Sequence, residues 1–112
     1  MNQIKNGFTN HLVPNEFFLS QNYPNPFKDK TVIKYCIAYK TKVKLSVYNS
    51  EGILIETLVN KEQNAGSYEV EFSAPDKNNK SFESETYFYC FEAGSFSNTK
   101  KMTLNKNSFK EV

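Results

Sequence analysis

One histidine and two cysteines are the side chains of this chain best suited to metal binding or nucleophilic catalysis. His11 has no cysteine or carboxylate near it at ligand spacing, so it predicts neither a metal site nor a general base. The run 76–79, Asp-Lys-Asn-Asn, resembles the start of a calcium-binding loop but lacks the later glycine and glutamate. No Ser/His/Asp or Cys/His set, phosphate-binding loop or carboxylate pair completes a catalytic motif. We therefore predict a protein that is not an enzyme and has no cofactor and no metal.

The two cysteines stand where an immunoglobulin-type fold can carry a disulfide between its sheets. Strand alternation argues against that bond, because Cys36 points outward if Tyr35 faces the core. Cys90 is likewise out of phase with the core candidates Tyr89 and Phe91. Two outward thiols on different sheets cannot reach the Cα separation of about 4.4–6.8 Å that a disulfide needs. We expect two free thiols, with the disulfide as the alternative.

The elements that would position these residues are short β-strands. Apolar and polar residues alternate strictly over 33–37, 43–47 and 68–72, and no helical period of useful length appears. Turn signals separate the strands, and the polar stretch 74–84 would cross between sheets. The pattern predicts an all-β fold, a seven-stranded antiparallel immunoglobulin-like β-sandwich. The predicted strands are 16–20, 31–37, 42–49, 53–59, 67–73, 86–93 and 96–104.

Length and composition allow one small domain and exclude several classes of partner. The chain has 112 residues, and ten Phe and seven Tyr supply much of a single core. The net charge is +2 and all 14 basic residues are lysines, which argues against nucleic acid as a partner. No apolar run approaches the ~20 residues that span a bilayer, so we expect no stable membrane insertion. We divide the chain into a linker or disordered lead (1–15), the domain (16–106) and a tail (107–112).

Residues 19–27, here called the proline-rich segment, carry the most specific pattern in the chain. Two prolines two positions apart exclude a helix or a central strand and favour extended backbone. Apolar anchors at Leu19, Tyr23 and Phe27 distinguish the segment from a flexible linker. We expect it to lie along the sandwich with Tyr23 and Phe27 buried.

The same segment carries a resemblance to a known family. Its residues 21–27 resemble the opening of the C-terminal sorting domains of type IX secretion cargo. Similar blocks follow in order at 31–35, 43–49, 57–59, 65–68, 87–89 and 100–102. The pattern is also related to the immunoglobulin-like domain of the flagellar hook-capping protein. The family-motif residues are Gln21, Asn22, Tyr23, Pro24, Asn25, Pro26, Phe27, Gly52, Gly66 and Tyr87.

This resemblance implies a non-catalytic tag that directs an attached cargo protein to the cell surface or the medium by way of the periplasm. The implied partners are the outer-membrane translocon and sortase-like components of the type IX system, with cargo linked upstream. Met1 to Glu16 lacks the basic start and apolar stretch of a secretory signal, so we expect the chain to be the C-terminal part of a larger exported protein. The resemblance places recognition on the final hairpin, at Phe96, Lys100, Lys101, Met102 and Leu104.

The lysines leave two interpretations open. Lys100 and Lys101 could serve recognition, or they could protect an edge strand against aggregation. Lys34, Lys42 and Lys44 could form a basic patch, although pairing across strands with the glutamates at 69 and 71 is the preferred interpretation.

A second function class is an immunoglobulin-like adhesive or carbohydrate-binding module. Such a module would need an exposed aromatic platform. Its candidates are Tyr39, Tyr48 and Phe88, although most aromatic residues here are better explained as core.

Overall fold

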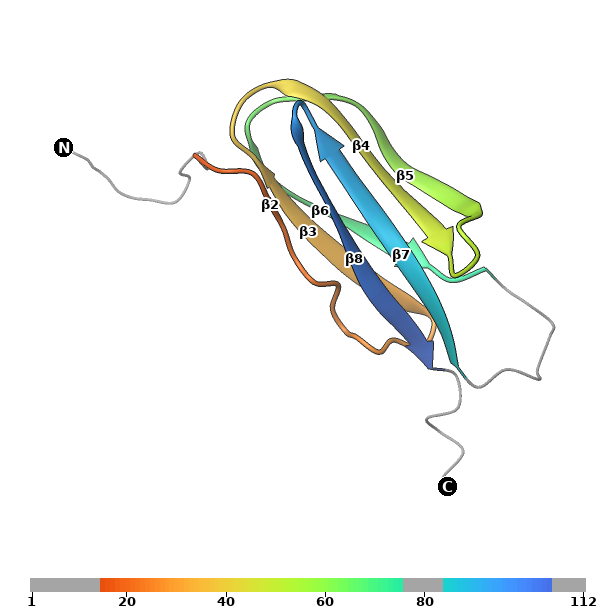
Figure 1. The fold of residues 1–112 in the computed structure, drawn as a ribbon. Helices are drawn as coiled ribbons and strands as arrows, with labels where there is room; N and C mark the ends of the chain where they lie inside the picture. Colours follow the sequence, from red (N-terminus) through yellow and green to blue (C-terminus); the bar gives the residue numbers. More distant parts are fainter. Residues whose placement is uncertain (1–14, 76–83, 106–112) are drawn as a thin grey trace.

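Alternating side chains place seven antiparallel strands in two packed sheets, as Figure 1 shows for this computed structural model. The structure describes residues 15–75 and 84–105. A three-stranded sheet has the order β2-β3-β6, and a four-stranded sheet has the order β5-β4-β7-β8. The predicted β-sandwich is confirmed. The strands are β2 (Phe18–Leu19), β3 (Lys30–Ile37), β4 (Thr41–Asn49), β5 (Leu54–Gln63), β6 (Gly66–Ser73), β7 (Ser84–Ala93) and β8 (Phe96–Asn105).

The core lies between the inner faces of the two sheets. Every second residue is buried over 31–37 in β3 and 43–47 in β4, as their alternation predicts, and Ser46 of β4 is buried as well. On β7, Tyr87, Tyr89 and Phe91 are fully buried and close the core from the other sheet. Two aromatic contacts cross between the sheets: Tyr35 meets Phe91 in a tilted arrangement at 4.9 Å, and Phe72 meets Tyr87 edge-on at 5.6 Å. The aromatic residues therefore supply much of the contact between the two layers.

The turn between β4 and β5 follows from two residues. The Asn49 side chain accepts hydrogen bonds from the backbone N–H groups of Glu51 (2.8 Å) and Ile53 (3.0 Å). Gly52 then takes a φ of +83°, a conformation that a side chain would strain. The connection from β6 to β7 passes from one sheet to the other, as predicted, and its residues 76–83 lie outside the described part.

The predicted strand boundaries lie within two residues of the observed ones, with one exception. The strand predicted at 53–59 continues to Gln63, because β4 supplies backbone partners as far as Thr41, which pairs with Gln63. Polar residues at 60–62 hid this extension. Two register shifts along the β4–β5 pair also break the regular alternation of β5.

A proline-rich segment that caps the last strand

The proline-rich segment begins as part of the three-stranded sheet and ends on the four-stranded sheet. Tyr23 exchanges two backbone hydrogen bonds with Val32 of β3, at 2.9 and 3.0 Å. Phe27 then forms a parallel bridge with β8: its N–H donates to the Thr103 carbonyl (2.9 Å), and its carbonyl accepts from the Asn105 N–H (2.8 Å). Figure 1 shows the segment in orange, passing from β2 to the C-terminal end of β8. The segment therefore closes one side of the sandwich.

Two amide side chains of the segment form hydrogen bonds with the backbone of β8. Gln21 Nε2 donates to the Lys101 carbonyl at 2.7 Å, and Asn25 Oδ1 accepts from the Thr103 N–H at 3.0 Å. Both contacts satisfy backbone groups on the outer edge of β8. Together with Phe27, they cap this edge from residue 101 to residue 105.

Asn22 holds the segment from the inside. Its side chain is 2% exposed, and its Nδ2 donates to Thr31 Oγ1 (3.0 Å) and to the Pro24 carbonyl (3.1 Å). Thr31 Oγ1 in turn donates to the same carbonyl at 2.8 Å. A buried amide needs such partners, because an unpaired buried polar group costs roughly 1–3 kcal/mol. The peptide bonds before Pro24 and Pro26 are both cis.

The aromatic anchors of the segment divide into one correct and one wrong prediction. Phe27 is 1% exposed and packs edge-on against Phe72 at 6.2 Å, and Leu19 is also buried. Tyr23, expected to be buried, is 79% exposed. The reason is alternation in an extended chain: since Asn22 points inward, its neighbour Tyr23 points to solvent.

Hydrogen bonds also join the segment and β2 to the rest of the sandwich. Ser20 exchanges bonds with Lys34 of β3, and its carbonyl accepts from the phenol of Tyr89 at 2.7 Å. Burial raises the pKa of Tyr89 to about 12. Burial likewise raises the pKa of Tyr35, whose phenol donates to Gln63 Oε1 at 2.7 Å. These buried phenols are structural donors that join β-strands to neighbouring elements.

The five predicted recognition residues all lie on β8, but they do not share one face. Lys100 pairs with the core residue Tyr89 and so occupies the inner face at the sheet edge, half-buried. Lys101 points to the outer face, beside Phe88, and is exposed. Phe96 is half-buried, and Met102 and Leu104 are 0% and 2% exposed. The structure therefore separates the two lysines, which the sequence presents as a pair.

Both cysteines are free, as predicted. Cys36 lies on the outer face of β3, with its Sγ 3.5 Å from Ser67 Oγ. Cys90 lies on β7 in the other sheet, opposite Ser46 of β4. Outward positions on separate sheets keep the thiols apart.

The predicted lysine pairs are only partly correct. Lys34 lies directly opposite Glu69, as expected. Lys42 and Lys44 belong to the other sheet and cannot meet Glu69 or Glu71. Lys42 lies opposite Glu62 of β5, and Lys44 lies between Asn60 of β5 and Glu92 of β7.

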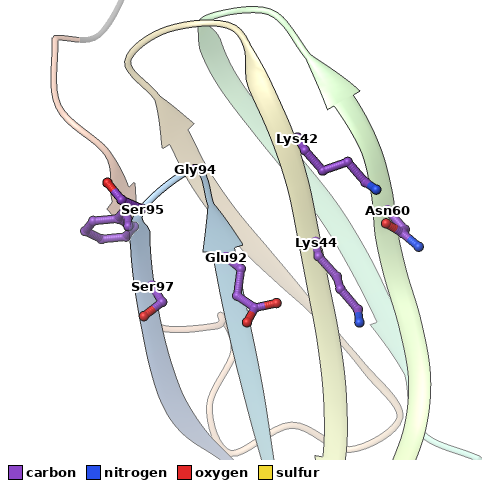
Figure 2. Close-up of a pocket in the computed structure, with 8 residues that line it drawn as sticks. Lys42, Lys44, Asn60, Glu92, Gly94, Ser95 and Ser97 are labelled. Atoms are coloured by element: carbon purple, nitrogen blue, oxygen red, sulfur yellow. The ribbon is translucent and has the colours of Figure 1, made fainter.

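A hollow of about 620 Å³ lies over the outer face of the four-stranded sheet, at the end near the β7–β8 turn. Figure 2 shows Lys42 and Lys44 on β4 with their side chains toward β5, and Glu92 on β7. Its polar lining is solvent-exposed and of mixed charge, which describes a solvated sheet surface rather than a ligand site.

The three candidate platform aromatics do not form one surface. Tyr48 and Phe88 are cross-strand neighbours, both half-buried, at the C-terminal end of β4. Tyr39 precedes the N-terminal end of β4 and packs edge-on against Phe17 at 5.0 Å. The platform that a carbohydrate-binding module would need is therefore divided between two ends of the sheet.

Several sequence predictions concern residues outside the described part. These are His11, the loop 76–79, residues 1–14 of the predicted lead 1–15, and the tail 107–112. Within residues 15–75 and 84–105, no group of three or more His, Cys, Asp or Glu side chains could hold a metal ion. The same residues include no helix that is long and apolar enough to cross a membrane.

Comparison with known proteins agrees with this geometry. The family model for the secretion system C-terminal sorting domain matches residues 21–105, from the proline-rich segment to the end of β8. No curated protein and no solved structure matches the chain. Since the match begins at Gln21 and ends at Asn105, it includes residues 21–27 of the segment and the strand that the segment caps. The chain belongs to the family of type IX secretion system C-terminal sorting domains.

Proposed function

We propose that the type IX machinery recognises the unit formed by the proline-rich segment and β8. The family is non-catalytic, and membership implies export of an attached cargo protein to the medium or the cell surface. Membership also implies contact with the secretion machinery. The finer proposal is that the outer-membrane translocon and sortase-like components bind this unit in the periplasm.

The observation that carries the proposal is the hydrogen bonding of Gln21, Asn25 and Phe27 to one edge of β8. These bonds tie the family motif at the start of the domain to the strand at its end. A partner that binds there would contact both at once, and only in the folded domain. Recognition of a folded surface would thus reject unfolded cargo tails.

Burial divides the predicted recognition residues into two roles. Met102 and Leu104 are buried and would position the strand rather than contact a partner. Lys101 is exposed on the outer face, and Lys100 is half-buried at the edge. Each lysine offers a cation to a partner from a different side of β8, and Lys101 is the more accessible.

The two ends of the described chain support an upstream cargo. The start of β2 and the C-terminal end of β8 lie at opposite ends of the sandwich (Figure 1). Near the first of these ends, Phe17 stacks on Phe96 with ring centroids 5.6 Å apart. Cargo joined at the N-terminal side would therefore leave the capped end of β8 free for a partner.

An export assay tests the proposal. Residues 16–112 are fused behind an unrelated protein that carries its own export signal, in a host with a type IX system. We expect the fusion to reach the medium or the surface, and Lys101→Glu to reduce export several-fold without lowering the melting temperature of the purified domain. Lys44→Glu, on the same outer face but on β4, is the matched control and should export normally. Normal export by both Lys101→Glu and Lys100→Glu would refute recognition at β8.

A further inference from the structure

The outer edge of β8 is capped along its C-terminal half and open along its N-terminal half. In an antiparallel strand, the N–H and C=O groups of alternate residues face the same side. The bonds from the proline-rich segment reach Lys101, Thr103 and Asn105, so the groups of Ser97 and Thr99 face the same outer side. Within the described part of the chain, these groups of Ser97 and Thr99 have no hydrogen-bond partner.

This open edge has the geometry for pairing with another strand. The β7–β8 register runs without a shift from Ser84 to Phe96, so no bulge turns the edge away. Ser97 and Thr99 are both exposed, and the open stretch contains neither proline nor glycine. By contrast, the β4–β5 pair has two register shifts. Of the two edge strands of the four-stranded sheet, β5 and β8, β8 is therefore the one with regular pairing.

The capped half of the same edge shows that β8 accepts an extended segment. Phe27 forms its parallel bridge there through two backbone bonds of 2.8 and 2.9 Å. The open half, residues 96–101, would extend that pairing by about 16–20 Å at the strand rise of about 3.3 Å per residue. An incoming strand of five or so residues would fill it.

Charge indicates what such a strand carries. Lys100 and Lys101 lie at the C-terminal end of the open half, with Lys100 on the inner face and Lys101 on the outer face of the sheet. Neither lysine forms an ion pair within the described residues. At the N-terminal end of the open half, Phe96 is half-buried against Phe17. A lysine on the inner face of an edge strand disfavours pairing with an entirely apolar strand. It favours pairing with a strand that places a carboxylate beside it. The complementary strand has apolar residues with at least one acidic side chain.

We propose that residues 96–101 bind an extended, acidic segment of a partner protein by strand addition to the open edge of β8. This inference rests on the proposed function only in taking the partner to be a component of the export machinery. The strand would lie beside the proline-rich segment and end where Gln21 caps Lys101. Main-chain hydrogen bonds would supply the affinity for the added strand, and the two lysines would make the site specific for an acidic one.

A peptide of six residues that alternates valine and glutamate, blocked at both ends, is the probe. Amide hydrogen exchange of the purified chain is followed by NMR with the peptide at millimolar concentration. We expect exchange at Ser97 and Thr99 to slow about tenfold or more, because strand addition protects outward amides. The same peptide with lysine in place of glutamate should protect them far less.

Thr99→Pro removes one outward N–H and should abolish the protection, since proline is tolerated on an edge strand whose N–H faces solvent. Glu69→Pro is the matched control on the edge strand β6. The Ala74 N–H of that sheet bonds toward Asp29, so by alternation the Glu69 N–H also faces outward. This variant should keep peptide binding at β8.

Three results would overturn the inference: no protection at millimolar peptide, protection confined to β5 or β6, or protection that grows with protein concentration when no peptide is present. The last result would assign the edge to a second copy of the chain. The export assay fails or succeeds independently, because peptide binding is measured on the isolated protein.

Discussion

The proline-rich segment and β4 are both extended, yet they are held in place by different means. β4 pairs with a strand on each side, and its inner face carries Val43, Leu45 and Val47, all fully buried. The segment has strand-like backbone bonds at its start in β2 and then only at Tyr23 and Phe27, and individual side chains fix the rest. In β4 the alternation of apolar and polar residues determines which side chains are buried, whereas in the segment each residue has its own partner. Substitutions in the segment should therefore differ more from one position to the next in their effect on stability than substitutions in β4.

The largest expected effect of this contrast lies at Phe27. Phe27→Ala removes a fully buried ring and leaves a cavity beside Phe72, which should lower the free energy of unfolding by about 3–5 kcal/mol. Tyr23→Ala removes a ring of the same size class from the same segment. Because Tyr23 is mostly exposed, that change should stay within about 0.5 kcal/mol. Urea unfolding of both variants measures the difference, and equal losses would show that the segment is held as a whole rather than by its anchors.

A smaller effect is expected at Asn22. Asn22→Ala removes a buried amide that bonds to Thr31 and to the Pro24 carbonyl, and should cost about 1–3 kcal/mol. Asn60→Ala, an exposed position on β5, is the control and should change stability by less than about 0.5 kcal/mol. Thermal unfolding compares the two. A silent Asn22→Ala would mean that the polar contacts beneath Pro24 do not hold the segment.

The same contrast explains what could be predicted from the sequence. β3 and β4 were predicted to within one residue at each end, because one buried face forces alternation. Cys36 and Cys90 were placed correctly on outer faces by the same rule. Where burial is incomplete the rule weakens, as at the polar end of β5, which ran on to Gln63.

In the proline-rich segment, hydrophobicity predicts the burial of Leu19 and Phe27 but is wrong for Tyr23. It also gives no sign that the polar residue Asn22 lies in the interior. Its burial depends on acceptors at Thr31 and Pro24 that are apparent only once the chain is folded. The capping roles of Gln21 and Asn25 were missed as well. A usable signal was present, because amide side chains beside prolines can supply the N–H donors that prolines lack and can also act as acceptors.

The smallest expected effect concerns the contact where the two regions meet. The Tyr89 phenol, on β7, donates to the Ser20 carbonyl at the start of the proline-rich segment, at 2.7 Å. Burial raises its pKa to about 12, against about 10 in an unfolded chain. The folded state thus keeps its proton where the unfolded state loses it. The stability from the neutral phenol is complete below about pH 10 and is lost as the pH rises toward about 12.

Tyr89→Phe separates this contribution from the rest of the alkaline loss, since it keeps the ring and removes the titrating group. We expect the variant to be slightly less stable than the parent chain at neutral pH, because the Ser20 carbonyl loses its donor. Between about pH 10 and 12 its free energy of unfolding should fall less steeply than that of the parent chain. The reason is that the variant has one buried phenol fewer that keeps its proton in the folded state and loses it on unfolding. Some decline should remain, since burial also raises the pKa of Tyr35 and Tyr87. Urea unfolding across this pH range gives both slopes, and identical slopes would mean that Tyr89 does not couple β7 to the segment through its proton.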